Sequence, residues 1–135
     1  MRAALLYDGG CGVCRWCAAA VLTLDRRRRL RPVAIRSDEG ERLLAGLDGA
    51  TRLGSWHLVG EDGVRFSAGA AVAPLLRLLP GGGPPAAVAE RAPGPVEAAY
   101  RAVAARRGAL GRLVHPRARA WADRVIAGRA TGPAD

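Results

Sequence analysis

The stretch LLYDGGCGVCRWC, residues 5–17, holds all three cysteines of the chain. It starts as an apolar run and then passes through Asp8-Gly9-Gly10, a combination typical of a turn. The stretch predicts a buried strand over residues 2–7, a turn, and a helix that begins near Cys11 and ends near Arg26–Arg29. The helix is indicated by small and apolar residues that recur with the spacing of one helix face, namely Cys14, Cys17, Ala18, Val21 and Leu22.

The residues that follow predict a second strand, a short helix and a hairpin. LRPVAIR, residues 30–36, has the pattern of a strand, with Pro32 near its start, where a missing N–H is tolerated. Asp38 and Glu41 have the spacing of a capping box and predict a helix that continues to Leu47. SWHLV and VRF, residues 55–59 and 64–66, flank the turn GEDG and predict the hairpin.

The second half of the sequence is predominantly helical. Ser67 is a candidate cap for a helix that ends before Pro80, and GGGPP, residues 81–85, is predicted to be a loop. Pro95 suits the first position of another helix, which we expect Gly108 to end. A last, basic helix is predicted over residues 116–128.

The predicted order is therefore strand, helix, strand, helix, hairpin and helix, followed by further helices. A βαβ unit followed by ββα predicts an α/β fold of the thioredoxin-like class, here over residues 1–114, with a helical C-terminal extension over residues 115–135. The cysteines lie on the first strand–helix turn, and open α/β sheets bind ligands beyond the carboxyl ends of their strands.

Composition limits the classes of protein that fit. The chain has 135 residues, enough for one domain with a core, and no apolar run of the roughly 20 residues that a membrane-spanning helix needs. The apolar start is too short for a secretory signal, so we expect a cytoplasmic protein. Clustered cysteines in that compartment are typically catalytic or metal-binding. The net charge is +9, and residues 91–135 carry nine arginines against three acidic residues.

The Cys11-x-x-Cys14 pair is suited to redox chemistry. At a helix start, unpaired N–H groups and the helix dipole stabilise a thiolate, and such settings lower a cysteine pKa from about 8.5 to about 3.5–7.5. Arg15 adds a positive charge nearby. Because the second sulfur lies one helical turn further on the same side, a disulfide can close. We expect Cys11 to attack a substrate disulfide and Cys14 to displace the reduced product. The dithiol itself carries two electrons, so no cofactor is implied.

The sequence Asp8-Gly9-Gly10-Cys11-Gly12-Val13-Cys14 resembles the D-G-x-C-x-x-C signature of the DCC family of thiol-disulfide oxidoreductase-like proteins. Residues 24–37, 55–80 and 98–113 are similar to the family's second strand, its hairpin with the following helix, and its C-terminal helix. The resemblance extends over residues 3–113. It implies a thioredoxin-like fold, a redox-active dithiol at Cys11 and Cys14, and Asp8 as the third signature residue.

The chain departs from this pattern at two places. Thioredoxin relatives usually carry a cis-proline before the hairpin, opposite the dithiol, whereas this chain has Leu53-Gly54-Ser55 there. The family commonly has an Asn-Arg pair where this chain has Arg106-Arg107, so a role of that Asn is not transferred.

The singled-out residues also have plainer interpretations. The cysteines are small enough to be core residues, and Cys17, on the apolar stripe, is favoured as one, with a second disulfide to Cys14 as the alternative. Asp8 is either a proton shuttle for the dithiol or a turn residue that accepts loop N–H groups. A zinc site would need a fourth ligand from His57 or His115, and the fourth cysteine of an iron–sulfur run is absent. A lone histidine on a strand is more often half-exposed at the surface.

We predict a thiol–disulfide oxidoreductase whose catalytic residues are Cys11, Cys14 and Asp8, with a protein or small-molecule disulfide or dithiol as partner. One alternative is a zinc or iron–sulfur module. The other is a basic adaptor whose helix over residues 115–129 contacts an anionic membrane surface or a protein, although packing onto the domain is favoured. Nucleic acid is disfavoured, because Arg26–Arg29 has neither interleaved aromatics nor a second basic cluster nearby.

Overall fold

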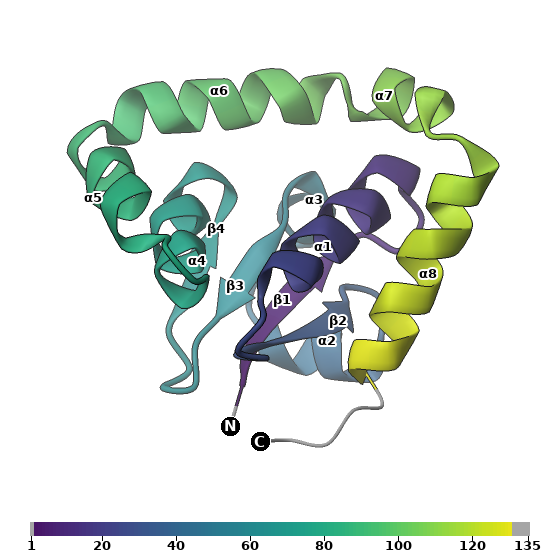
Figure 1. The fold of residues 1–135 in the computed structure, drawn as a ribbon, viewed down its shortest axis with the longest axis horizontal. Helices are drawn as coiled ribbons and strands as arrows, with labels where there is room; N and C mark the ends of the chain where they lie inside the picture. Colours follow the sequence, from purple (N-terminus) through teal and green to yellow (C-terminus); the bar gives the residue numbers. More distant parts are fainter. Residues whose placement is uncertain (1, 131–135) are drawn as a thin grey trace.

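A four-stranded mixed sheet with helices on both faces forms the centre of the computed structural model, which describes residues 2–130 (Figure 1). Its strands follow the order β2-β1-β3-β4, in which β1 is parallel to β2 and antiparallel to β3, and β3 is antiparallel to β4. This mixed α/β arrangement confirms the predicted thioredoxin-like fold class. The strands are β1 (Ala3–Tyr7), β2 (Leu30–Ala34), β3 (His57–Val59) and β4 (Arg65–Ser67).

The helices between and after the strands make up most of the described chain. They are α1 (Gly12–Leu24), α2 (Asp38–Leu43), α3 (Gly49–Gly54), the 3₁₀ helix η1 (Ala68–Ala71), α4 (Val72–Leu78), α5 (Gly83–Arg91), α6 (Pro93–Ala105), α7 (Arg107–Leu113) and α8 (Pro116–Ala130). In residues 2–130, none of these helices has both the length and the apolar character to cross a bilayer.

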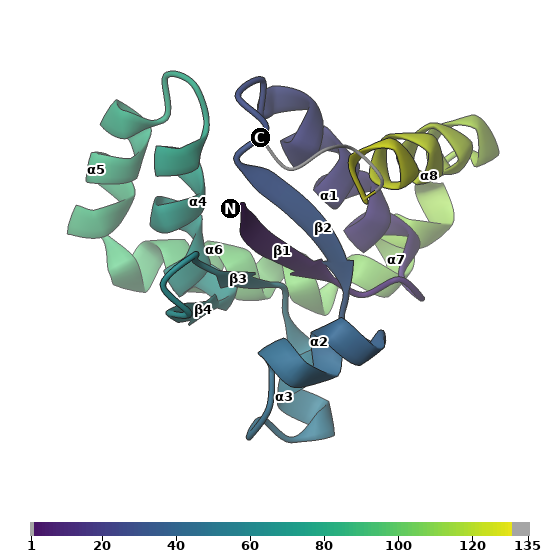
Figure 2. The same cartoon turned by 90° about the horizontal axis from the view of Figure 1, so that it is seen from below.

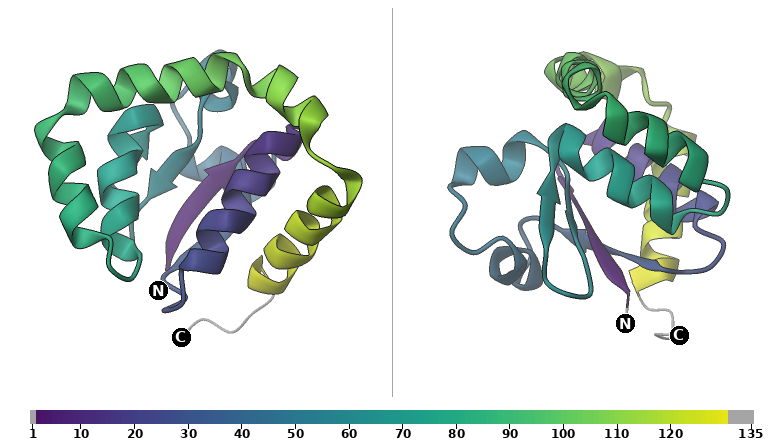
Figure 3. Two further views of the ribbon diagram at one scale, coloured as in Figure 1. Left: turned by 45° about the horizontal axis from the view of Figure 1, so that its top comes forward. Right: turned by 90° about the vertical axis from the view of Figure 1, so that its left-hand side faces the viewer.

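Two cores lie on opposite faces of the sheet, beneath the helices that Figures 2 and 3 show on each side. α1, α4 and α8 cover one face, where Leu5 and Leu22 are buried; α2 and α3 cover the other, where Leu6 and Leu44 are buried. Because alternate residues of β1 enter the two cores, β1 is apolar on both sides, as a central strand must be. β2 is an edge strand, so Pro32 in its middle removes no ladder bond that the sheet needs.

The predicted helix after the turn is confirmed, but it ends at Leu24, before Arg26–Arg29. Asp25 is the cause. Its carboxylate accepts hydrogen bonds from the backbone N–H groups of Arg29 (3.0 Å) and Leu30 (2.9 Å), and this turns the chain back into β2.

Two helix starts between β2 and β3 differ from the prediction. Ser37, not Asp38, caps α2, because its Oγ accepts the N–H of Gly40 at 3.1 Å; the predicted capping box was one residue out of register. α3 was not predicted at all. Asp48 caps it by accepting the N–H of Thr51 at 2.7 Å, and the sequence D-x-x-T was the available signal.

The second half contains three further corrections. The predicted loop 81–85 is wrong in part, because Gly83 already begins α5 and prolines are compatible with a first helical turn. Likewise α6 begins at Pro93 rather than Pro95. Gly108 ends no helix but lies inside α7, after a break at Arg106.

The basic C-terminal helix is confirmed, and it packs beside α1 (Figure 1). Ala122 and Ile126 are buried in the core that α1 and β1 also form, and Trp121 and Val125 pack against it. The apolar residues that an interfacial helix would insert into a membrane are therefore used inside the protein. The segment 131–135 of the predicted extension lies outside the described residues.

Candidate functional site

The turn between β1 and α1 is organised by Asp8. Its Oδ1 accepts the N–H of Gly10 at 2.9 Å, and its carbonyl oxygen accepts the N–H of Cys11 at 3.2 Å. Asp8 as a whole residue is buried. This is the geometry of the turn role expected for Asp8, and it sets the position at which α1 begins.

Cys11 is the N-cap residue of α1, and no side chain caps the helix start. Its carbonyl oxygen accepts the N–H of Arg15 at 3.1 Å, the first bond of the helix. All three cysteines are free and partly buried. The structure therefore places Cys11 and Cys14 at the helix entrance, as predicted, with Cys17 one turn further along α1.

The thiol of Cys14 retains its proton. Burial, a hydrogen bond to the sulfur of Cys11, the charge of Cys11 and that of Asp8 together raise the pKa of Cys14 to about 12, whereas the charge of Arg107 opposes this shift. Burial, and secondly the charge of Cys11, also raise the pKa of Cys17. Of the two sulfurs in the C-x-x-C pair, that of Cys14 is thus the one whose protonated form is favoured.

Arg107, the first residue of α7, is the side chain that links the dithiol to the segment opposite. Its Nη2 donates to the carbonyl oxygen of Leu53 at 2.7 Å, and its Nη1 lies 4.0 Å from Sγ of Cys14. Leu53 belongs to the segment where thioredoxin relatives have their proline. In this chain the side chain of Arg107, rather than a proline, connects that segment to the dithiol.

His57 also binds the segment that contains Leu53, through the carbonyl oxygen of Arg52. It is fully buried, not half-exposed as a lone strand histidine was expected to be. Its Nε2 faces the carbonyl oxygen of Arg52 at 2.9 Å and must donate, so Nδ1 accepts the hydroxyl of Ser67 at 2.6 Å. Ser67 was predicted to cap the following helix, but its hydroxyl binds His57 and makes no cap to η1.

Folding stability is expected to fall at acid pH because of His57. Burial lowers its pKa, and Arg65 adds to this, although the Arg52 carbonyl opposes it. As the pH falls below about 6.5, the unfolded chain binds a proton that the folded chain does not, so the free energy of unfolding decreases. Urea unfolding at pH 7.5 and pH 5 checks this. The decrease in the free energy of unfolding between the two pH values should be smaller in His57→Gln than in the wild-type chain, and in His115→Gln it should equal that of the wild-type chain. A decrease in His57→Gln as large as that of the wild-type chain would contradict the assignment.

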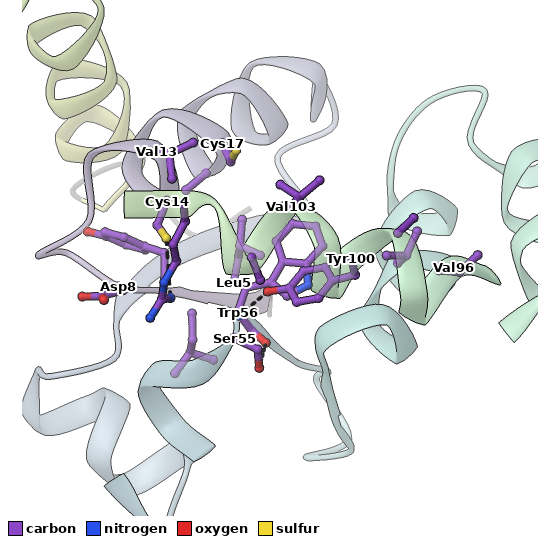
Figure 4. A pocket seen from close by; sticks show the side chains of 17 residues that line it. Leu5, Asp8, Val13, Cys14, Cys17, Ser55, Trp56, Val96, Tyr100 and Val103 are labelled. Atoms are coloured by element: carbon purple, nitrogen blue, oxygen red, sulfur yellow. Dashed lines mark hydrogen bonds between the residues drawn. The ribbon is translucent and has the colours of Figure 1, made fainter. Parts of the chain in front are cut away.

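An apolar cavity of about 440 Å³ opens beside Cys14 (Figure 4). It extends from Asp8 and Cys14, past the rings of Trp56 and Tyr100, to Val96 on α6. Those two rings stack with centroids 5.7 Å apart, and the backbone N–H of Trp56 donates to the Tyr100 hydroxyl at 2.9 Å. Cys17 also lines the cavity, so it is not sealed in the core.

A second cavity, of about 310 Å³, lies on the side of Cys11. Arg107 borders both cavities, so the dithiol lies between an apolar space and a basic one. The other residues that line the second cavity are Gly10, Gly12, Gly108, Gly111, Arg112 and Arg119.

The structure gives no support to a zinc ligand set. In residues 2–130, no three histidine, cysteine or acidic side chains are grouped so that they could hold a metal ion. His57 uses both ring nitrogens elsewhere, and Nδ1 of His115 accepts the N–H of Arg117 at 3.1 Å.

Comparison with known families agrees with this geometry. The model of the DCC1-like thiol-disulfide oxidoreductases matches residues 5–113. The chain belongs to this family. No curated protein and no solved structure matches the chain. Membership of the DCC1-like family indicates thiol–disulfide exchange as the general activity, and the matched range includes Asp8, both cysteines of the C-x-x-C pair and Arg107.

Sequence reasoning missed part of this DCC1-like site. Arg107 was noted only as half of an Arg-Arg pair, and Trp56 and Tyr100 only as parts of the hairpin and of the C-terminal helix that resemble those of the family. The chain folds α6 and α7 across the end of the sheet where β1 meets α1 (Figure 3), and this brings residues some 90 positions apart together. Only the family's recurrent Arg at this position was a usable signal.

Proposed function

We propose that this protein exchanges dithiols and disulfides through Cys11 and Cys14, with Cys11 as the nucleophile. The Cys11 thiolate attacks one sulfur of a substrate disulfide, which forms a mixed disulfide and releases the other half as a thiolate. The Cys14 thiolate then attacks the Cys11 sulfur and releases the second half. Two electrons pass from the dithiol to the substrate, and the two thiol protons end on the products.

The observation that carries this assignment is the position of the two cysteines, since Cys11 is the N-cap residue of α1 and Cys14 lies inside the helix. Burial, and secondly the neighbouring Cys11, raise the pKa of Cys14 to about 12, which keeps it protonated at neutral pH. Only a thiolate attacks a disulfide efficiently, so the first attack falls to Cys11, at the positive end of α1.

The second step follows from the first. Once Cys11 is in a mixed disulfide, it has no charge, and its hydrogen bond to Cys14 is weakened. Two of the causes that raise the pKa of Cys14 are then removed, while Arg107 still stabilises the thiolate. Cys14 is thereby activated when its attack is needed.

Asp8 and Cys17 have supporting roles in this proposal. Asp8 is a positioning residue, because its bond to Gly10 fixes the turn that presents Cys11; the alternative role, as acceptor of the Cys14 proton, is compatible with its charge acting on that thiol. Cys17 is not required for the exchange. The proposal includes a cytoplasmic location, as expected from the sequence.

Trapping of the mixed disulfide tests the two roles. Reduced Cys14→Ser, in a Cys17→Ser background so that no other thiol resolves it, is expected to accumulate a stable adduct on Cys11 with hydroxyethyl disulfide. Mass spectrometry of the intact chain and of its peptides detects the adduct.

The matched variant is Cys11→Ser in the same background, which should accumulate no comparable adduct. Cys17→Ser alone should form the Cys11–Cys14 disulfide as the wild-type chain does. Equal trapping at both positions would show that the roles of nucleophile and resolving thiol are wrongly assigned.

A further inference from the structure

Apart from Cys11 and Arg107, the exchange mechanism uses none of the residues that line the basic cavity beside Cys11. Three guanidinium groups from two helices border it: Arg107 and Arg112 of α7, and Arg119 of α8. None of the residues that line it, all within the described part of the chain, is acidic. The positive charge of this cavity is therefore not neutralised from within.

Arg119 is already held in a fixed position. Its Nη2 donates to the carbonyl oxygen of Gly111 at 2.7 Å, which ties α8 to α7. Its Nε is buried and has no hydrogen-bond partner among residues 2–130. A buried N–H donor without a partner is costly, and a ligand oxygen would satisfy it once a small shift of the Arg119 side chain opens Nε to the cavity.

Arg119 and α7 pack closely against the start of α1, at two glycines. A Cβ atom on Gly12 would lie 3.5 Å from Nε of Arg119, and one on Gly111 would lie 3.7 Å from the backbone nitrogen of Val13. The first N–H groups of α1 have no side-chain cap, and Gly12, the first residue of this helix, lines the cavity together with the arginines.

Taken together, a cavity with three cations, an unpartnered buried donor and the cysteine nucleophile fits an anion that is attached close to a sulfur atom. We propose that this cavity binds the carboxylate of a small anionic disulfide, so that the preferred substrates are short carboxylated disulfides rather than neutral ones. The inference rests on the function proposed above and names its substrate class. The carboxylate is held by Arg112 and Arg119 while Cys11 attacks the adjacent sulfur, and the released half leaves as a carboxylated thiolate.

Substrates of matched size and different charge test this preference. Reduced wild-type protein is mixed with dithiodipropionate (dianionic), hydroxyethyl disulfide (neutral) or cystamine (dicationic), and each rate is divided by the rate of mercaptoethanol with the same disulfide. We expect a normalised preference of about tenfold or more for the dianion over the neutral disulfide at low ionic strength, decreasing with added salt.

Arg112→Gln and Arg119→Gln should each reduce this preference by about threefold or more. Arg112 is exposed, so its replacement tests the charge without risk to the fold. Arg124→Gln is the matched control, because it removes one exposed arginine from the same helix as Arg119 but outside the cavity, and should leave the preference unchanged.

Binding of a thioether separates the two proposals. Thiodipropionate carries the same carboxylates but cannot exchange, and calorimetric titration measures its affinity for the full chain. Binding that is weakened in Arg112→Gln and Arg119→Gln, without any disulfide exchange, would support the anion site and overturn the exchange function. Exchange with no preference for the dianion, and no binding of thiodipropionate, would overturn the anion site and leave the exchange function standing.

Discussion

At pH 8, iodoacetamide is expected to modify Cys11 first and to label Cys14 about a hundredfold more slowly than an ordinary exposed thiol. The reason is the proton on Cys14, whose pKa is raised to about 12, chiefly by burial and by Cys11. Such a thiol is ionised to about one part in ten thousand at pH 8. The greater nucleophilicity of a more basic thiolate recovers only part of this loss.

The same argument predicts how Cys14 responds when Cys11 is replaced. Cys11→Ser removes the charge of Cys11 and weakens the acceptor for the Cys14 thiol, but it leaves the burial, which is the largest cause of the shift. The midpoint of the pH profile of Cys14 labelling should therefore move to lower pH, but it should still lie at higher pH than the midpoint of an ordinary thiol. Mass spectrometry of the alkylated peptides over a range of pH values measures both profiles.

Cys17→Ser is the matched control for this measurement. It removes a thiol one turn away on the same helix that is not among the groups shifting the pKa of Cys14. Its Cys14 profile should coincide with that of the wild-type chain. Labelling of Cys14 before Cys11 in the wild-type chain would contradict the assignment of the nucleophile, whatever the variants show.

The elements near the dithiol were predictable because their signals are local. The apolar run before Asp8, the turn and the helical spacing after it all act within one supersecondary unit, and the structure reproduces the strand, the turn and the helix. α3 was missed because its six residues carry no apolar periodicity, and its only signal was the Asp48 cap. The prolines after Gly82 suggested a loop because proline is compatible with both a loop and a first helical turn.

The site was predictable only in its cysteines and Asp8. Arg107 contacts Cys14 because α6 spans the end of the sheet and α7 begins beside the dithiol, and neither distance nor direction can be read from local patterns. His57 is a similar case. A strand histidine is buried here because Arg52 and Ser67 supply a partner for each ring nitrogen, and those partners come from other elements. The spacing of residues in the sequence thus does not predict which distant residues a polar side chain contacts in the fold.

Asp25→Ala is expected to lower the free energy of unfolding by about 3–5 kcal/mol. The carboxylate is fully buried and accepts Nη1 of Arg129 at 3.1 Å, in addition to the two backbone N–H groups that start β2. Nη2 of Arg129 donates to the carbonyl oxygens of Leu22 and Asp25. Removal of the carboxylate would leave a guanidinium in a largely buried site without its counterion and two N–H groups without acceptors.

Urea unfolding followed by circular dichroism measures this loss, and Asp123→Ala is the matched control. Asp123 pairs with Arg15 at 3.5 Å, but both side chains are substantially exposed, so its replacement should change the free energy of unfolding by no more than about 1 kcal/mol. Arg129→Met should be less harmful than Asp25→Ala, because the Asp25 carboxylate keeps its two backbone donors. Equal small effects of Asp25→Ala and Asp123→Ala would contradict the view that α8 is anchored through Arg129. A large effect of Asp25→Ala would make the C-terminal helix part of the folding unit that presents the dithiol, since the same residue ends α1, begins β2 and binds α8.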